Sequence, residues 1–282
     1  MKKILIFGAS GLVGSALQTI GSARRYQIVA PTRAEVDLLN TSALDAYVTG
    51  CEADVVMNAA ALLKIDALEQ DPIPAWQINT VAAGVIARAA ARRPLTTLIY
   101  ISTQLIFDGT KDFYTEEDTP SPTTVYGLTK YHGEMLTRHF STLGNIRHHI
   151  VRTALIYGDK RKTFVDEVAN TLQAGKVFEA STNQYSNPTS AIDLAETIYT
   201  NFVDVGNQNP IVHVINHAPK KGVSRYEIAQ HIAGLVGVPL SNVVEPKHDV
   251  FVTKRPNVSL INTKLPQLPE WNSSLQKHIL GK

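Results

Sequence analysis

Cysteine is scarce in this sequence, with Cys51 as the single example among 282 residues. One cysteine cannot form an internal disulfide, so a disulfide-stapled secreted fold is excluded and a reducing compartment is expected. The chain also lacks an apolar run of the roughly 20 residues that a membrane-spanning helix needs. The first apolar run begins almost at residue 2 and is interrupted by glycine, which is not the pattern of a signal peptide. We therefore expect a cytoplasmic protein with no membrane partner.

A strong excess of charge of one sign is missing too. The chain carries 27 Lys and Arg against 25 Asp and Glu, a formal net charge of +2. Nucleic acid is therefore not an expected partner, because its binding requires a basic surface. Metal-ligand clusters are also lacking: His213 and His217 are four residues apart, but Pro219 and a β-rich run argue against a helical metal-binding face. We expect no metal site.

The hydrophobic pattern indicates an α/β fold. Hydrophobic residues make up 44% of the chain, enough for one large core or two smaller ones. The apolar runs that predict strands lie at 3–7, 26–30, 54–57, 97–102 and 148–152. Between them, helices are predicted at about 11–21, 42–49, 74–92 and 125–142. Strands that alternate with helices form βαβ units, so we predict a Rossmann-type, doubly wound parallel sheet.

The pattern becomes less regular after about residue 155. Helices are predicted at 161–174, 190–203 and 224–237, and short strands at 176–179 and 211–215. We therefore expect a first domain at 1–155 and a smaller C-terminal lobe at 156–282, with segments of the lobe returning to the first domain.

Glycines punctuate the turn after the first predicted strand. Gly8, Gly11 and Gly14 are spaced G-x-x-G-x-x-G, and a helical stretch follows. Strand, glycine turn and helix form the context of a dinucleotide-binding fingerprint, because small residues let the backbone approach a pyrophosphate. The start of the helix then offers free N–H groups to the phosphates. The alternative is a tight strand–helix turn that binds nothing.

Arg33 follows the second predicted strand, where an acidic residue would bind the ribose 2′-hydroxyl of NAD. An arginine there can pair with a 2′-phosphate instead, which favours NADPH over NADH. Glu35 would weaken this argument if the loop curled back, and Arg33 could also be an ordinary surface charge.

A second set of residues can transfer protons. Tyr126 and Lys130 are four positions apart in a predicted helix, so their side chains share one face. An ammonium favours phenolate, so we expect the pKa of Tyr126 to fall below its usual value of about 10. Hydroxyl groups at Ser102 and Thr103 end the fourth predicted strand. A tyrosine tuned in this way can serve in general acid–base catalysis. Alone, the pair could equally be a helix start with an exposed lysine.

These motifs, in this order, carry a family resemblance. The chain resembles the extended short-chain dehydrogenases/reductases, close to the dTDP-4-dehydrorhamnose reductase group. The matching segments run almost end to end: GASGLVG at 8–14, VDLLN at 36–40, DVVMNAAA at 54–61, IN at 78–79, YISTQLIFDG at 100–109, YTEEDTPSPTTVYGLTKYHGE at 114–134, VRTALIYG at 151–158, NQYSNPTSAIDLA at 183–195 and RPNVSL at 255–260.

The resemblance implies roles for individual residues. Tyr126 would protonate the substrate oxygen, and Lys130 would lower its pKa and hold the nicotinamide ribose. Thr103 would hydrogen-bond the same substrate oxygen, with Ser102 as the alternative. Hydride would come from NADPH. The cofactor-binding residues would be Gly8, Ser10, Gly11, Leu12, Val13, Gly14, Arg33, Asp37, Leu38, Ala59, Ala60, Ala61, Tyr126 and Lys130.

The substrate end departs from the family pattern. Gln104 stands where these reductases usually have aspartate, and Leu155 where tryptophan is usual. The first change loses a charge and the second a stacking surface, so we expect a nucleotide-linked 4-keto sugar other than dTDP-4-dehydrorhamnose. Tyr185 and Arg255 complete the predicted substrate residues, the arginine as a partner for phosphate.

Three functions remain open on the sequence. The first is an NADPH-dependent reductase of a nucleotide-linked keto-sugar. The second is a nucleotide-sugar epimerase or dehydratase, which would use the same tyrosine and lysine. The third is a non-catalytic NADP-binding regulatory subunit, since that of methionine adenosyltransferase resembles this same group. Homodimers are common in the superfamily, so the resemblance also implies a homodimer.

Overall fold

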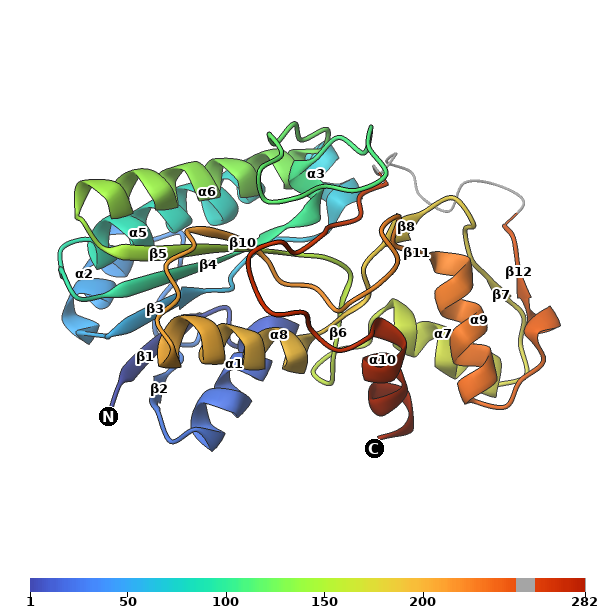
Figure 1. Cartoon of the computed structure of the whole chain (residues 1–282). Coiled ribbons are helices and arrows are strands. Elements are labelled where there is room, and N and C mark those ends of the chain that lie inside the picture. Colours follow the sequence, from blue (N-terminus) through green and yellow to red (C-terminus); the bar gives the residue numbers. More distant parts are fainter. Residues whose placement is uncertain (247–256, 282) are drawn as a thin grey trace.

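A parallel β-sheet lies at the centre of the computed structural model, which describes residues 1–246 and 257–281 (Figure 1). Its six strands run in the order β10-β5-β4-β3-β1-β2, and every neighbouring pair is parallel. The strands are β1 (Lys3–Phe7), β2 (Gln27–Val29), β3 (Val55–Asn58), β4 (Thr97–Thr103), β5 (Arg147–Thr153) and β10 (Ile211–His213). The predicted Rossmann-type fold is confirmed.

The strand order reverses next to β1. The chain passes from β1 to β2 on one side and then returns to place β3 on the other side of β1. At such a switch point the loops after neighbouring strands diverge and leave a crevice at the carboxyl ends of the strands. The glycine turn after β1 therefore opens at this crevice.

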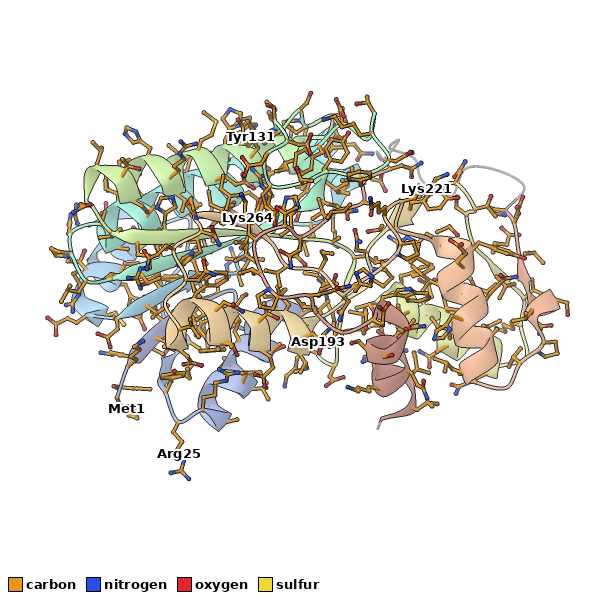
Figure 2. All side chains as sticks on the ribbon, in the orientation of Figure 1. Met1, Arg25, Tyr131, Asp193, Lys221 and Lys264 are labelled. Atoms are coloured by element: carbon orange, nitrogen blue, oxygen red, sulfur yellow. The ribbon has the colours of Figure 1, made fainter. Side chains whose placement is uncertain are left out.

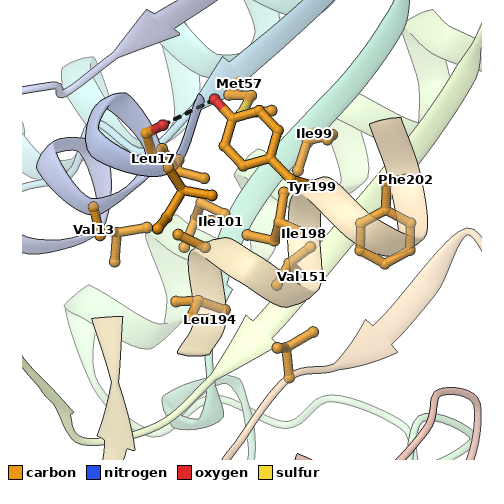
Figure 3. Packing of buried hydrophobic residues seen from close by; sticks show 14 of the residues in the cluster. Val13, Leu17, Met57, Ile99, Ile101, Val151, Leu194, Ile198, Tyr199 and Phe202 are labelled. Atoms are coloured by element: carbon orange, nitrogen blue, oxygen red, sulfur yellow. Dashed lines mark hydrogen bonds between the residues drawn. The ribbon is translucent and has the colours of Figure 1, made fainter. Parts of the chain in front are cut away.

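Helices cover both faces of the sheet (Figure 1). One face carries α1 (Leu12–Ala23) and α8 (Ala191–Ile198), the latter continued by the π-helical η3 (Tyr199–Asp204). Their apolar side chains form one core with the sheet (Figure 3), where the Tyr199 hydroxyl donates to the Leu17 carbonyl at 2.9 Å.

The opposite face carries α2 (Thr41–Cys51), α5 (Ala83–Ala90) and α6 (Val125–Leu143). A second core lies between α2, α5 and the sheet and includes Leu5, Leu44 and Ile86. The predicted helix at 74–92 is built from α4 (Ile73–Ala75), the π-helical η1 (Trp76–Ala82) and α5. The shorter α3 (Ile65–Gln70) precedes them.

A smaller helical lobe lies beside the sheet. Its helices are α7 (Phe164–Gln173), α9 (Arg225–Leu235) and α10 (Trp271–Leu280), which share a separate apolar core. Three two-stranded ribbons accompany them: β6 (Ile156–Tyr157) with β9 (Thr189–Ser190), β7 (Phe178–Glu179) with β12 (Val243–Val244), and β8 (Tyr185–Ser186) with β11 (Val223–Ser224). The 3₁₀ turns are η2 (Gln104–Ile106) and η4 (Leu240–Asn242).

The second half of the chain is tied to the first at several points. β10 joins the edge of the main sheet, and α8 packs beside α1. Asp193 of α8, labelled in Figure 2, lies on the side of the molecule that faces α10. Its carboxylate accepts hydrogen bonds from Asn216 and from Ser274 of α10. The division at residues 155 and 156 therefore stays a prediction, because the chain crosses it repeatedly. Within the described residues, no helix has the length and apolarity to cross a membrane.

Candidate active site

One large cleft of about 1790 Å³ lies along the carboxyl ends of the central strands and extends to the small lobe. It brings together most of the residues that the sequence singles out. Those that line it are Gly8, Ser10, Gly11, Leu12, Val13, Arg33, Asp37, Leu38, Ala59, Ala60, Ala61, Ser102, Thr103, Gln104, Tyr126, Lys130, Leu155 and Tyr185. Arg255 lies outside the described residues, and Gly14 does not line the cleft.

The glycine turn is built by close backbone packing. Gly8 has φ +76°, and a Cβ there would lie 2.5 Å from the Ala60 nitrogen. A Cβ on Gly14 would lie 2.2 Å from the Gly8 carbonyl oxygen, so Gly14 lets α1 pack onto the turn. Gly11 caps α1 without any side-chain hydrogen bond, which leaves the first N–H groups of the helix available to a ligand.

Asparagines order the loop after β3. Asn58 Oδ1 accepts from the Ala60 nitrogen at 3.1 Å, and Asn79 Oδ1 accepts from the Leu62 nitrogen at 2.9 Å. Neither asparagine lines the cleft. The two asparagines instead fix the backbone of Ala59, Ala60 and Ala61, which line the cleft. A flat ligand group can lie against these small side chains.

Arg33 stands at the rim of the cleft with an 82% exposed side chain. Its Nε lies 4.0 Å from Asp37 Oδ1, a loose ion pair. The Glu35 carboxylate accepts from the Thr32 nitrogen at 2.7 Å and from its hydroxyl at 2.9 Å. Glu35 is thus engaged within its own loop, and it does not line the cleft.

The two hydroxyls of the proton-transfer set meet at the bottom of the cleft. Thr103 ends β4, and Tyr126 lies in the first turn of α6, whose N-cap Thr124 accepts from the Gly127 nitrogen at 3.1 Å. The Thr103 side chain lies near enough to the Tyr126 phenol to favour its ionised form. Only 8% of each residue is exposed. β4 and the N-terminus of α6 therefore place both hydroxyls at one point.

Lys130 lines the cleft, and its amine is held against the sheet. Its Nζ donates to the Ile101 carbonyl at 2.6 Å and stands 3.9 Å from the centre of the Tyr100 ring. The residue is 2% exposed, and burial lowers the pKa of its amine to about 7, with the Glu134 charge opposing the shift.

The predicted fall in the pKa of Tyr126 is wrong for this arrangement. Burial raises it to about 12, although the Thr103 side chain and the charge of Arg161 act in the opposite direction. Desolvation disfavours the phenolate more than the nearby groups stabilise it. Tyr126 is consequently a protonated phenol at neutral pH.

Two further hydroxyls line the bottom of the cleft. Ser102 Oγ and Thr153 Oγ1 are buried and have no hydrogen-bond partner among the described residues. They stand on the neighbouring strands β4 and β5. A buried polar group without a partner is costly, so both are suited to a polar ligand group.

The far end of the cleft belongs to the small lobe. Gln104 Oε1 accepts from the Ser186 hydroxyl at 2.9 Å, which leaves the amide NH₂ of Gln104 as its donor. Leu155 and Tyr185 line the same end, and Lys221 Nζ stands 4.6 Å from the centre of the Tyr185 ring.

Cations that the sequence argument missed also line this end. Lys160 and Arg225 join Arg161 along the cleft. Arg225 begins α9, and its guanidinium lies 4.4 Å from the centre of the Phe164 ring. The Lys160-Arg161-Lys162 run already makes Arg161 a candidate partner for phosphate and was a usable signal for Lys160, whereas a lone arginine at a helix start gave none for Arg225.

Comparison with known proteins decides the family. Residues 1–280 match the family described as the RmlD substrate binding domain. The chain belongs to the RmlD family. The predicted resemblance to the dTDP-4-dehydrorhamnose reductase group is thereby confirmed.

Curated relatives of this RmlD family member include both a methionine adenosyltransferase subunit and dTDP-4-dehydrorhamnose reductases. It is 30% identical to methionine adenosyltransferase 2 subunit beta of Mus musculus, over 95% of this chain and 82% of that protein. It is 27% identical to dTDP-4-dehydrorhamnose reductase of Aggregatibacter actinomycetemcomitans, over 95% of this chain and 93% of that protein.

Solved structures agree with the fold. A dTDP-4-dehydrorhamnose reductase ortholog from Clostridium acetobutylicum is 28% identical, with a TM-score of 0.88 over 98% of both chains. The Bacillus anthracis dTDP-4-dehydrorhamnose reductase, in complex with NADP, has a TM-score of 0.89 at 24% identity, over 100% of this chain and 99% of that chain. At that identity the likeness concerns the fold alone.

The residues at 1–246 and 257–281 contain no group of three or more His, Cys, Asp or Glu side chains arranged to hold a metal ion. The titratable groups that line the cleft include Asp37, Tyr126 and Lys130.

Proposed function

We propose that this chain is an NADPH-dependent reductase of a nucleotide-linked 4-keto deoxysugar. The observation that carries the proposal is that Thr103 and Tyr126 lie buried in the same cleft as the glycine turn. The family includes dTDP-4-dehydrorhamnose reductases that are similar over nearly the whole chain. The proposed partner of the protein is a small nucleotide sugar, and we propose neither a membrane nor a nucleic-acid partner.

The residues of the cleft fit a dinucleotide. Gly8 and Gly14 keep the backbone of the turn free of Cβ atoms that would collide with it, and the N-terminus of α1 offers N–H groups to a pyrophosphate. Arg33 would hold the 2′-phosphate, and Asp37 and Leu38 would border the adenine. When bound, NADPH supplies hydride to the carbonyl carbon of the substrate.

The proton comes from Tyr126. Reduction of a ketone places negative charge on its oxygen, so a donor must be protonated before the reaction. With a pKa of about 12, the phenol meets that requirement over the whole physiological range. The Thr103 hydroxyl would hydrogen-bond the same oxygen and stabilise its charge as it develops. Lys130 would hold the ribose beside them.

The far end of the cleft would bind the sugar and its phosphates. Gln104 presents an amide donor, and Leu155 an aliphatic surface. Lys160, Arg161 and Arg225 provide cations for a diphosphate. Because an amide and an aliphatic group replace the usual carboxylate and indole, we propose a sugar other than dTDP-4-dehydrorhamnose.

A direct test mixes the protein with NADPH and a panel of 4-keto nucleotide sugars and follows the nicotinamide absorbance. Tyr126→Phe should lower turnover by about 100-fold or more and leave NADPH binding within about threefold. Tyr131→Phe, on the same helix but outside the cleft, is the matched control. Full activity in Tyr126→Phe would exclude the tyrosine as the acid.

A regulatory function is the second candidate, because methionine adenosyltransferase 2 subunit beta is the most similar relative named above. Such a subunit would bind NADP without turnover and change the rate of another enzyme. An epimerase or dehydratase would instead isomerise or dehydrate a sugar without net cofactor use. The protonated state of Tyr126 favours reduction over a cycle that begins with a phenolate base.

We also propose that the protein acts in the cytoplasm and forms a homodimer. Cys51 is a free thiol, which suits a reducing compartment. Sedimentation analysis of the purified chain tests the dimer, and a monomer at all concentrations would exclude it.

A further inference from the structure

Tyr126 and Lys130 belong to a longer series of buried polar residues. Glu134 follows at the same spacing, so the three side chains project from one face of α6 on successive turns. Glu134 is 3% exposed, as deeply buried as Lys130. A buried carboxylate is costly unless something offsets its desolvation.

Arg152 of β5 holds Glu134. Its Nε donates to Glu134 Oε1 at 3.1 Å, and its Nη2 donates to Oε2 at 2.8 Å. This two-point contact suits an ionised carboxylate, and both side chains are 3% exposed. Replacing such a buried pair by apolar groups is often neutral or stabilising, so fold stability alone is a weak reason for it.

The negative charge of Glu134 stabilises the protonated amine of Lys130. Among the described residues Lys130 has no carboxylate within ion-pair distance, and its Nζ contacts only the Ile101 carbonyl and the Tyr100 ring. Burial lowers the pKa of the amine to about 7, and the negative charge of Glu134 works against that loss. At neutral pH, Lys130 therefore lies close to the point at which it would become uncharged.

Other groups around this series do not supply the same charge. Tyr100 stays neutral because burial raises its pKa well above 10.0, and burial lowers the pKa of His213 to about 4. The titratable and charged side chains near this series are Tyr100 on β4, Tyr126 on α6 itself, and Arg152 on β5 with His213 beside it on β10. The carboxylates of neighbouring segments act elsewhere: Glu69 of α3 accepts from the Val125 nitrogen, and Glu116 and Asp118 act on His213.

We propose that Glu134, held by Arg152, is a positioning residue that keeps Lys130 as an ammonium ion beside the cleft. This inference rests on the proposed function, in which Lys130 holds the nicotinamide ribose. Glu134 touches neither cofactor nor substrate and does not line the cleft. It acts through Lys130.

The test measures the NADPH dissociation constant of the full chain by nicotinamide fluorescence between about pH 5 and pH 9. In the wild type, affinity should weaken above pH 7, as Lys130 loses its proton. In Glu134→Gln the same weakening should begin about one pH unit lower, which makes binding near neutral pH up to about tenfold weaker. Glu134→Asp retains the charge and should retain the wild-type profile.

A double variant separates this effect from simple support of the fold. Glu134→Gln alone leaves Arg152 as an uncompensated buried charge, whereas Glu134→Gln/Arg152→Met removes both charges. The double variant should regain thermal stability yet keep the displaced pH profile. A uniform loss of affinity with no displacement in Glu134→Gln, or a wild-type profile in the double variant, would overturn the inference.

The readout does not depend on the substrate. If the wild type binds NADPH but reduces no sugar in the panel, the proposed function fails while the pH profile still tests Glu134. If sugars are reduced and the profile does not move, only the inference fails.

Discussion

At the scale of single residues, burial outweighs proximity in the acid–base chemistry of the cleft. The spacing of Tyr126 and Lys130 predicts a lowered tyrosine pKa, yet burial raises it to about 12 and lowers that of Lys130 to about 7. Sequence spacing predicts that two side chains share one face of a helix. It does not predict how far the rest of the fold excludes solvent from them, and that exclusion decides both pKa values.

Lys130→Met should make the protein more stable and less active. The native pKa of Lys130 is about 7, below its ordinary 10.5, so the unfolded chain binds more protons between these values and stability rises with pH there. The destabilising effect of the lysine is therefore fully present below pH 7 and disappears as pH approaches 10.5. Thermal melts should show Lys130→Met a few degrees above the wild type at pH 6.

Lys64→Met, which changes a surface lysine, serves as the control and should show no such pH-dependent gain. An equal midpoint for Lys130→Met and the wild type across the pH range would contradict the lowered pKa.

Arg33→Ala should weaken NADPH binding far more than NADH binding. The side chain is exposed at the cleft rim and only loosely paired, so its guanidinium is available to a 2′-phosphate. A charge-assisted contact of this kind contributes about 1.5–3 kcal/mol, or roughly 10- to 100-fold in NADPH affinity. Fluorescence titration with both cofactors measures the ratio, with Arg138→Ala as the control for loss of a surface charge. Equal losses for the two cofactors would remove the 2′-phosphate assignment.

At the scale of elements, the turn between β1 and α1 shows why glycine spacing can be read from sequence. Gly8 needs its positive φ, and Gly14 needs its missing Cβ, so both requirements are local. The strands β1, β3 and β4 were predictable for a similar reason, because strands buried on both faces are largely continuous apolar runs.

Other elements left no comparable signal. α10 is largely polar and the strands of the small ribbons are two residues long, so their positions depend on contacts with distant segments. The same limit explains why Arg225 was missed: only the folded lobe brings the start of α9 to the cleft.

Gly14→Ala should destabilise the protein and weaken NADPH binding together. The added Cβ would stand 2.2 Å from the Gly8 oxygen and 2.7 Å from the Ala9 Cα, so α1 must move away from the turn. Overpacking of this kind costs about 1–3 kcal/mol, which urea denaturation would detect.

Gly50→Ala in α2 is the matched control, because its Cβ would meet nothing within 4 Å. That change should be neutral or stabilise the protein by up to about 1 kcal/mol. If Gly14→Ala were equally harmless, the packing argument for the turn would be wrong.

At the scale of the whole molecule, the two halves of the chain complete one another. Ile198, Tyr199 and Phe202 cover the face of the sheet that also contacts α1, and β10 adds its edge strand. Asn216 and Ser274 bond Asp193, which fastens the C-terminal helix to α8. The cleft therefore has walls from both halves on a shared frame.

A fragment of residues 1–155 should not fold cooperatively, because it lacks α8, η3 and β10. The apolar face that carries Leu17 and Ile99 would be exposed to water. Near-ultraviolet circular dichroism and urea denaturation of the fragment, beside the full chain, measure this. A sharp urea transition in the fragment would instead show that the predicted first domain is independent.

The late position of β10 and α8 also bears on how the protein is made. During translation, β1, β3, β4 and β5 leave the ribosome well before residues 191–213, which cover and extend them. The nascent chain must therefore expose an apolar surface for the time needed to synthesise roughly sixty residues after β5, a delay of several seconds. Chaperones that act on growing polypeptides would find their principal binding site on that unfinished sheet.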